Sequence, residues 1–401
     1  MAKRSIDKFL NTKPITQQAA IGQQKHRFGK NARPPGNPVA APKGTPRFIP
    51  PPSTNLDNLN LALNVVLPDE AAAVEAGGVL VFDAVGDTGG IHGDDVQKAV
   101  ANAMEAQREG VAASKVPAAA FVYNLGDVVY FNGLSNLYIS QFYEPYQDLH
   151  AAIFAIPGNH DGDTQTRPGD PVDSEPSLFG FMRNFCDTVS HPASAYRPTM
   201  TQPYVYWTLE APFTRIIGLY SNVDGSLDAR GTNEQQRWLV NQLAAASKNE
   251  CVILAVHHPP YSLDTTHGGY PEIEVAIDSA IHATGRVPTA VLSGHVHSYQ
   301  RYERVLGGAK VPYVVAGAGG YANTLKLLHR IEKDANGKPL PKNFQTTHPD
   351  LKLATFVDTD PGYLRVSIDG KKRTLSLDYF VVPFSGAPPS GKAADSVTVP
   401  W

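Results

Sequence analysis

The chain has 401 residues and a mass of 43.2 kDa, with 42% hydrophobic and 18% charged residues. A chain of this size and composition can bury a large core, which excludes a wholly disordered protein. No apolar run approaches the roughly 18 residues that a membrane-spanning helix needs, which excludes a polytopic membrane protein. The formal charge is −3, but residues 1–53 carry +9, which leaves −12 on the remaining 348 residues.

Residues 1–53 differ from the rest of the chain in composition as well as in charge. They contain nine prolines and ten Lys or Arg against one acid, Asp7, and they show no apolar periodicity. Such a segment buries too little apolar surface to offset its chain entropy, so we predict an extended or disordered basic tail. No secretory signal is recognisable at its start, and a cytoplasmic protein is the default expectation. Residues 54–401 are expected to form one domain.

The first half of this domain alternates short apolar runs with helical patterns. Strands are predicted over 78–86, 118–125 and 151–156, with helices over 94–109 and 137–149 between them. This order predicts parallel pairing through right-handed crossovers. The following segment, 161–203, is rich in Pro, Asp and Ser and is expected to form a long insertion loop.

The second half continues with strands and helices and then with strands alone. Strands are predicted over 204–210, 214–220, 251–256, 289–293, 312–316, 353–357, 363–368 and 373–382, and helices over 233–248 and 272–284. The last two strands flank a turn signal, Asp369-Gly370, and should form a hairpin. The chain is therefore assigned to the α/β class, as two sheets that face each other with helices outside.

Each core strand ends in a group of residues that can bind metal. The groups are Gly86-Asp87-Thr88-Gly89-Gly90, Gly126-Asp127-Val128-Val129-Tyr130, Pro157-Gly158-Asn159-His160-Asp161, His257-His258-Pro259-Pro260 and Gly294-His295-Val296-His297. A single aspartate after a strand is usually a turn residue. Ligands in open α/β sheets gather beyond the carboxyl ends of the strands, so five such groups together indicate one site.

The residue types at these strand ends favour a pair of cations. Carboxylate, amide, imidazole and phenolate groups suit hard or borderline ions, and too many ligands are present for one ion with open positions. Two ions ~3.5–4 Å apart stabilise both the attacking and the leaving oxygen in a displacement at phosphorus. Asp127 is the expected bridge, and a hydroxide shared by the ions is the expected nucleophile. The chain contains neither a Gly-x-Ser-x-Gly elbow nor a Gly-x-x-x-x-Gly-Lys-Ser/Thr phosphate loop.

The order of these motifs resembles the calcineurin-like metallophosphoesterase superfamily. Gly89 stands where the superfamily commonly has a histidine, and Tyr130 follows Asp127 by three residues. This exchange is the signature of the purple acid phosphatases, which the chain resembles over roughly residues 78–320. The resemblance implies a four-layer α/β/β/α sandwich of two mixed sheets flanked by helices, the calcineurin-like phosphoesterase fold.

The same resemblance implies a role for each site residue. A ferric ion would be held by Asp87, Asp127, Tyr130 and His297, and a divalent iron, zinc or manganese ion by Asp127, Asn159, His257 and His295. His160 would contact the phosphate and help to protonate the leaving group. His267, ten residues after His257, is a second catalytic candidate, and the alternative for it is an exposed loop histidine.

These expectations make the protein a binuclear metal-dependent hydrolase of small-molecule phosphate esters, of the acid-phosphatase phosphomonoesterase type. The alternatives are a phosphodiesterase or nucleotide hydrolase on the same centre, or a scaffold that has lost catalysis. The basic tail has few aromatic residues for stacking, so no nucleic-acid partner is expected. Specificity is expected from the 161–203 segment and from Tyr261, Tyr299 and Tyr321.

The two cysteines, Cys186 and Cys251, form no metal-binding or redox spacing. They are expected to be free thiols, with a long-range disulfide as the alternative.

Overall fold

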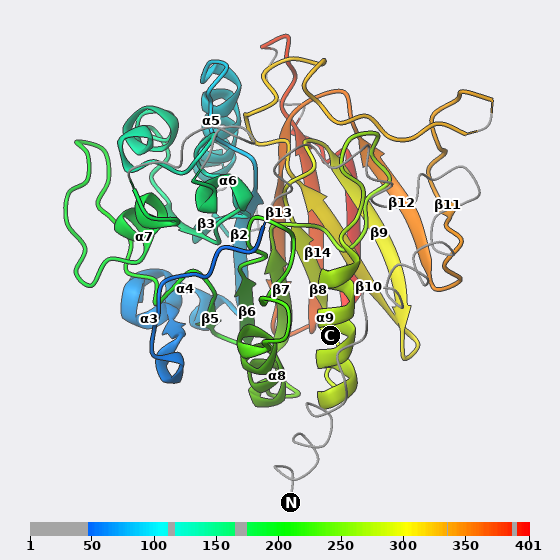
Figure 1. Cartoon of the computed structure of the whole chain (residues 1–401), viewed down its shortest axis with the longest axis horizontal. Helices are drawn as coiled ribbons and strands as arrows, with labels where there is room; N and C mark the ends of the chain where they lie inside the picture. Colours follow the sequence, from blue (N-terminus) through cyan, green and yellow to red (C-terminus); the bar gives the residue numbers. More distant parts are fainter. Residues whose placement is uncertain (1–46, 111–116, 165–174, 335, 387–390) are drawn as a thin grey trace, which may run out of the picture.

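The computed structural model describes residues 47–110, 117–164, 175–334, 336–386 and 391–401 (Figure 1). Most of the predicted basic tail, residues 1–46, lies outside the described residues. Two sheets form the centre of the molecule, as the sequence predicts. None of the helices in the described ranges is both long and apolar enough to cross a bilayer.

The larger sheet has nine strands and takes most of its chain from the second half of the sequence. In spatial order the strands are β1 (Asn60–Ala62), β5 (Trp207–Ala211), β6 (Thr214–Leu219), β7 (Cys251–Val256), β8 (Ala290–Ser293), β10 (Ala309–Ala316), β9 (Tyr299–Leu306), β12 (Leu351–Val357) and β11 (Phe344–Gln345). The run β6–β7–β8–β10 is parallel. The pairs β5–β6, β10–β9, β9–β12 and β12–β11 are antiparallel, and β1 pairs with β5 in parallel. The sheet is therefore mixed.

The smaller sheet joins the start of the domain to its end. In spatial order its six strands are β15 (Asp395–Pro400), β14 (Thr374–Val381), β13 (Gly362–Asp369), β2 (Val79–Val85), β3 (Phe121–Asn124) and β4 (Ala152–Ala155). β2, β3 and β4 pair in parallel, which confirms the predicted parallel pairing. β13 and β14 form the predicted hairpin, with Asp369 opposite Thr374.

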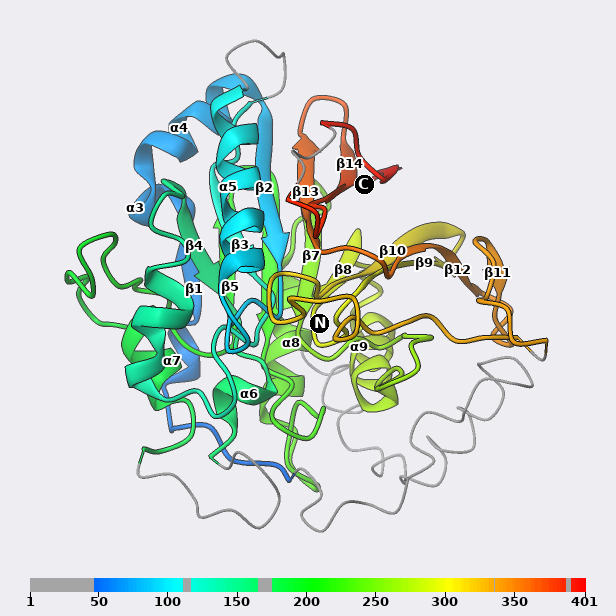
Figure 2. The same ribbon diagram turned by 90° about the horizontal axis from the view of Figure 1, so that it is seen from above.

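Helices cover the outer faces of both sheets. They include α3 (Leu63–Val66), α4 (Pro68–Gly77), α5 (Asp95–Glu109), α8 (Glu234–Ala245) and α9 (Pro271–Thr284), with a 3-10 turn at Leu56–Asn58. The short helices α6 (Asn159–Gly162) and α7 (Phe179–Phe185) lie in the segment between β4 and β5. Figure 2 shows α8 and α9 on one side of the larger sheet and β13 and β14 on the other. On the smaller sheet, the Tyr363 hydroxyl of β13 bonds to Gln107 of α5. The four-layer α/β/β/α arrangement is confirmed.

The alternation of side chains along β7 shows why the central strands are continuously apolar. Cys251, Ile253 and Ala255 belong to the core between the two sheets. Val252, Leu254 and Val256 belong to the core under the helices. A strand that is buried on both faces cannot expose polar residues along its length. Polar residues are instead concentrated where these strands end.

The carboxyl ends of the central strands of both sheets meet at one edge of the sandwich. Gly86, after β2, donates its N–H to Ala316 of β10 at 2.9 Å. Asp87 donates to the carbonyl of Gly126, after β3, at 2.9 Å. Gly294, after β8, donates to His257, after β7, at 3.1 Å. These bonds between loops bring the predicted metal-binding groups into one region.

Two local predictions were wrong. Residues 137–149 do not form the predicted regular helix. A 3-10 turn at Ser135–Leu137 is followed by a π-helical turn at Ile139–Tyr143. Pro145 supplies no N–H that could continue a helix. The 161–203 segment is not a plain loop, because it contains α7. The Phe181 and Phe185 side chains of α7 are fully buried, so their apolar spacing outweighs the polar composition around them.

Strands β9 and β15 and helix α4 were not predicted. β9 reads Tyr-Gln-Arg-Tyr-Glu-Arg-Val-Leu, and its charged residues hide the strand. Cys186 and Cys251 are free thiols, as expected.

Candidate metal centre

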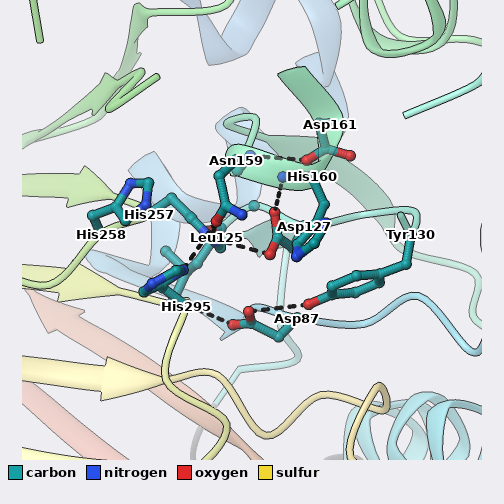
Figure 3. Close-up of polar contacts among 12 residues, drawn as sticks. Asp87, Leu125, Asp127, Tyr130, Asn159, His160, Asp161, His257, His258 and His295 are labelled. Carbon is teal, nitrogen blue, oxygen red and sulfur yellow. Dashed lines mark hydrogen bonds and ion pairs between the residues drawn. The ribbon is translucent and has the colours of Figure 1, made fainter. Parts of the chain in front are cut away.

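The loops at the shared edge bring the predicted ligands together in two groups (Figure 3). The first group surrounds the side-chain oxygen of Asn159. This oxygen lies 3.1 Å from His257 Nε2 and 2.9 Å from His295 Nδ1. Asp127, His257 and His295 each offer a ligand atom, and these atoms lie within 4.8 Å of one another.

The second group surrounds one carboxylate oxygen of Asp87. Asp87 Oδ1 accepts a hydrogen bond from the Tyr130 hydroxyl at 3.2 Å and lies 3.5 Å from His297 Nε2. The other oxygen accepts the backbone N–H of His295 at 2.7 Å. The two sides of the site are thus tied together by one carboxylate.

Asp127 lies between the two groups in Figure 3. Its Oδ1 accepts the backbone N–H of His160 at 2.9 Å, and its Oδ2 lies 3.3 Å from His257 Nε2. Asp87, Asp127 and His295 have φ angles of 58°, 55° and 67°. Non-glycine residues rarely adopt this left-handed conformation, and it is concentrated at functional sites. Here it occurs at three of the seven predicted ligands.

Asp161, for which the sequence predicted no role, holds two of the loops in place. Its carboxylate accepts the N–H of Gly158 at 2.8 Å and that of Val128 at 3.1 Å. It thereby links the loop after β3 to the loop after β4. Burial and the nearby Asp127 raise the pKa of Asp161 to about 7, and these N–H groups oppose that rise.

Two glycines leave room for the carboxylates. A Cβ on Gly158 would lie 2.1 Å from Asp127 Oδ1, and one on Gly317 would lie 2.5 Å from Asp87 Oδ2. Any larger residue at either position would displace a carboxylate oxygen. The glycines in these two motifs therefore have a steric reason.

Hydrogen bonds to the far side of two imidazoles select which nitrogen faces the centre. His257 Nδ1 donates to the carbonyl of Leu125 at 2.9 Å, which leaves Nε2 as the free acceptor. His295 Nε2 lies 2.8 Å from the Tyr270 hydroxyl, which leaves Nδ1 toward Asn159. A metal-binding histidine usually has such a partner on its other nitrogen. No motif in the sequence marks Tyr270 for this role.

The electrostatics of the centre favour bound cations. Asp87 and Asp127 are both fully buried. Burial, opposed by His257 and assisted by Asp127, raises the pKa of Asp87 to about 7. Burial would also raise the pKa of Asp127, but His257 and His160 hold it below its usual value. Buried carboxylates are normally paired or bound to metal. Oxygen donors mixed with imidazoles, without thiolates, fit two hard or borderline cations.

A cavity of about 490 Å³ opens beside the ligands, and both catalytic candidates line it. His160 Nδ1 donates to the carbonyl of Phe131 at 2.7 Å, so Nε2 remains for a substrate. His267 is exposed, and its ring lies 4.3 Å from that of His295. His267 is thus a loop histidine that also borders the site.

The expected specificity tyrosines do not share one location. Tyr321 lines the cavity, and its ring lies 4.2 Å from that of Tyr130. Tyr261 and Tyr299 are buried in the core, and the expectation was wrong for both. Tyr299 begins β9 and stacks on Tyr379 of β14 between the sheets. Among the described residues, no member of the 161–203 segment lines the cavity.

A family model described as calcineurin-like phosphoesterase matches residues 80–299, which is more than half of the chain. The chain belongs to the calcineurin-like phosphoesterase family. The match spans β2 to the start of β9 and therefore includes all the loops that carry the predicted ligands. This phosphoesterase is accordingly a metal-dependent hydrolase of phosphoric esters.

Several known proteins are similar to this phosphoesterase. Human tartrate-resistant acid phosphatase type 5 is 24% identical over 323 residues, which cover 74% of this chain and 86% of the human protein. The purple acid phosphatase isolated from yellow lupin (Lupinus luteus) seeds matches with a TM-score of 0.54 at 18% identity, over 80% of this chain and 54% of the lupin chain. The phosphoesterase thus spans about half of the lupin enzyme.

GAP50, described as the anchor in the inner membrane complex of Plasmodium, matches with a TM-score of 0.53 at 12% identity, over 80% of this chain and 89% of that chain. At these identities the two structural likenesses concern the fold alone.

Proposed function

We propose that the chain is a phosphomonoesterase of the purple acid phosphatase type. The observation that carries this proposal is the pair of ligand groups on either side of Asp127, one of which contains the buried hydroxyl of Tyr130. The Tyr130 hydroxyl bonds to the buried carboxylate of Asp87. Burial and the nearby Asp127 and Asp87 raise the pKa of Tyr130 strongly, so the phenol would need a strongly polarising, trivalent ion to lose its proton. Only a strong Lewis acid would deprotonate it at neutral pH.

The residues that would hold each ion follow from the two groups. The ferric ion would be held by Asp87, Asp127, Tyr130 and His297, and the divalent iron, zinc or manganese ion by Asp127, Asn159, His257 and His295. When bound, such ions lower the pKa of water and neutralise charge on the phosphate oxygens. The left-handed backbone at Asp87, Asp127 and His295 presents their side chains before any ion arrives.

In the proposed reaction, His160 is the main side chain of the protein that acts directly on the substrate. Its Nδ1–H bond to Phe131 fixes the ring, and Nε2 is the atom left to carry a proton to the leaving oxygen. The backbone N–H of His160 is bonded to Asp127, so the imidazole and the central carboxylate keep a fixed spacing. His267 borders the same cavity and would contact the substrate rather than an ion.

Elemental analysis and a visible spectrum of protein purified without chelators test the metal assignment. We expect two metals per chain and a visible charge-transfer band that Tyr130→Phe abolishes. Tyr321→Phe is the matched control, because its ring packs on Tyr130 but belongs to neither ligand group. A colourless protein with zinc or manganese at both positions would overturn the iron assignment. Two bound metals without turnover of any phosphate ester would support the scaffold alternative instead.

Monoester and diester substrates with the same leaving group, such as p-nitrophenyl phosphate and bis(p-nitrophenyl) phosphate, test the reaction type. We expect a larger kcat/KM for the monoester. A preference for the diester would show that the phosphodiesterase alternative is correct.

A further inference from the structure

A π-helical turn, Ile139–Tyr143, lies where the sequence predicts a regular helix. The N–H of Glu144 donates to a carbonyl five residues earlier at 2.9 Å. Such turns are rare in proteins, and they occur frequently at functional sites. Phe142 and Tyr143 of the turn belong to the apolar core, but the buried Gln141 is polar. Gln141 therefore needs hydrogen-bond partners inside the protein.

Both ends of the Gln141 side-chain amide bond to the backbone of Tyr130. Oε1 accepts the N–H of Tyr130 at 3.0 Å, and Nε2 donates to the carbonyl of Tyr130 at 2.8 Å. The two bonds hold the peptide groups on either side of the Tyr130 Cα, so they fix the direction in which its side chain leaves the backbone. Gln141 is only 5% exposed, so water has little access to replace either bond.

Gln141 is held in turn by helix α5. The Gln97 side chain donates through Nε2 to the carbonyl of Gln141 at 2.7 Å, and Gln97 is fully buried. α5 is itself tied to the smaller sheet by the bond between Gln107 and Tyr363. A group on regular secondary structure is positioned more precisely than one on a loop. The position of Tyr130, which lies in a loop, is therefore set through Gln141 by a helix.

Gly89 leaves the space that Tyr130 and Gln141 occupy. A Cβ on Gly89 would lie 2.7 Å from Gln141 Oε1 and 2.7 Å from Cδ2 of the Tyr130 ring. A side chain at position 89 would thus displace one of these two residues. The glycine that stands in place of the commoner histidine therefore provides room for the amide as well as for the phenol.

The segment that Gln141 holds also positions His160. The carbonyl of Phe131, the next along the chain from that of Tyr130, accepts the His160 Nδ1–H at 2.7 Å. Gln141 holds one carbonyl, and the adjacent carbonyl holds the imidazole. A displacement of Tyr130 would change the direction of the Phe131 carbonyl and, with it, that of the His160 ring. Gln141 thus supports a predicted ligand and the proton donor at once.

We propose that Gln141 is a positioning residue of the metal centre, which orients the Tyr130 phenol toward the trivalent ion. The inference rests on the proposed function, in which Tyr130 is a ligand. Gln141 does not line the cavity, and it acts through the backbone of Tyr130. Loss of its two bonds should weaken the contact between phenol and ion, because the partners of metal ligands typically change metal affinity about 10–100-fold.

Gln141→Met tests the inference, because methionine has nearly the same length but has no donor and is a weak acceptor. We expect this variant to bind ferric ion about 10–100-fold more weakly in a titration of the metal-free protein. At saturating iron its charge-transfer band should move and lose absorbance per bound ion. Gln141→Glu should restore the wild-type band at pH 5. Burial raises the pKa of a carboxyl group, and its protonated form again offers a donor and an acceptor.

Tyr143→Phe is the matched control. It removes a buried hydrogen bond of the same turn, from the Tyr143 hydroxyl to Asn184 Oδ1 at 2.8 Å, but no bond to Tyr130. We expect it to lose stability in urea unfolding while its band and its ferric affinity stay those of the wild type. An unchanged band and affinity in Gln141→Met, or the same changes in Tyr143→Phe, would overturn the inference. A Gln141→Glu band at pH 5 that matches that of Gln141→Met would also overturn it.

Two further measurements separate this inference from other failures. If Gln141→Met does not fold, Gln141→Asn takes its place. The shorter amide of that variant cannot reach both backbone groups of Tyr130, so its ferric affinity should fall, and an unchanged affinity would overturn the inference. A colourless wild type would refute the iron assignment of the proposed function instead. The affinity of Gln141→Met for the metal then found would support the inference if it falls and overturn it if it does not.

Discussion

The buried ion pair between Asp83 and Arg365 makes the sharpest prediction about stability. The two residues are opposite each other on β2 and β13. The guanidinium donates through Nε and Nη2 to the two carboxylate oxygens at 2.8 and 2.9 Å. Asp83 is 1% exposed and Arg365 is 4% exposed, so water cannot replace either partner. β2 leads directly to Asp87, so this pair also supports the strand that delivers a predicted ligand.

Arg365→Met should lower the free energy of unfolding by about 3–5 kcal/mol, because it leaves a buried carboxylate without its partner. The double variant Asp83→Leu/Arg365→Met should recover most of this loss, because an apolar pair of similar size removes both desolvation costs. Lys372→Met is the surface control. Its exposed pair with Asp369, at the turn that follows β13, should contribute about 0.5 kcal/mol or less.

The loss of unfolding free energy in Arg365→Met should also depend on pH. Burial raises the pKa of Asp83 above 3.8, and Arg365 opposes this rise. Without Arg365 the folded-state pKa is higher still, so the folded state binds a proton that the unfolded state releases. The folded state is then favoured in acid, and this contribution is lost as the pH rises through the folded pKa. The gap between single and double variants should therefore be smallest near pH 4 and largest at neutral pH.

Urea unfolding at saturating metal, followed by circular dichroism, measures these differences. Equal slopes against urea across the variants would show that only stability has changed. A loss below about 1 kcal/mol in Arg365→Met, or a double variant that is no more stable than the single one, would refute the reasoning.

Three further variants test the centre itself. Asp127→Ala should lose both ions, and retention of two metals by elemental analysis would exclude a bridging role. His160→Ala should keep both metals but lower kcat about 10²–10⁴-fold, with the largest fall for esters with poor leaving groups. A fall in kcat of the same size for all leaving groups would contradict proton donation by His160. Tyr270→Phe should weaken binding of the divalent ion about 10–100-fold, measured by titration of the metal-free protein, while Tyr196→Phe at an exposed site should not; equal affinities would show that Tyr270 does not orient His295.

The sequence predicted the sandwich and the ligand region because both depend on simple regularities. The continuous apolar run of β7 exists because this strand is buried on both faces. Asp127 and His257 follow their strands directly, so the parallel arrangement of the strands suffices to bring them to one edge. Strand β9 escaped notice because only some of its side chains are buried, and its charged residues, Arg301, Glu303 and the buried Arg304, interrupt the apolar pattern.

The supporting residues could not be predicted in the same way. Tyr270 and His295 are 25 positions apart, and Asp161 and Val128 are 33 apart. Any hydroxyl or carboxylate at a suitable place could make these contacts, so no residue type marks them. Metal ligands come from a short list of side chains, whereas orienting groups do not. The specificity roles predicted for Tyr261 and Tyr299 were wrong for a related reason. Residue type alone cannot separate a core tyrosine from one that faces a cavity.

The two sides of the cavity are held in different ways. The ligand loops are fixed by bonds between strand ends of both sheets, and they follow directly from the central strands. The segment 326–330, which carries Lys326 and Arg330, follows β10 and is bonded to the loop after β7, to His297 and to Asp358. A substitution at the exposed Lys326 can alter the charge beside the cavity without removing these bonds, whereas a substitution at His329 removes a hydrogen bond to the predicted ligand His297. Substrate choice can therefore change on this fold while the metal-binding chemistry stays the same.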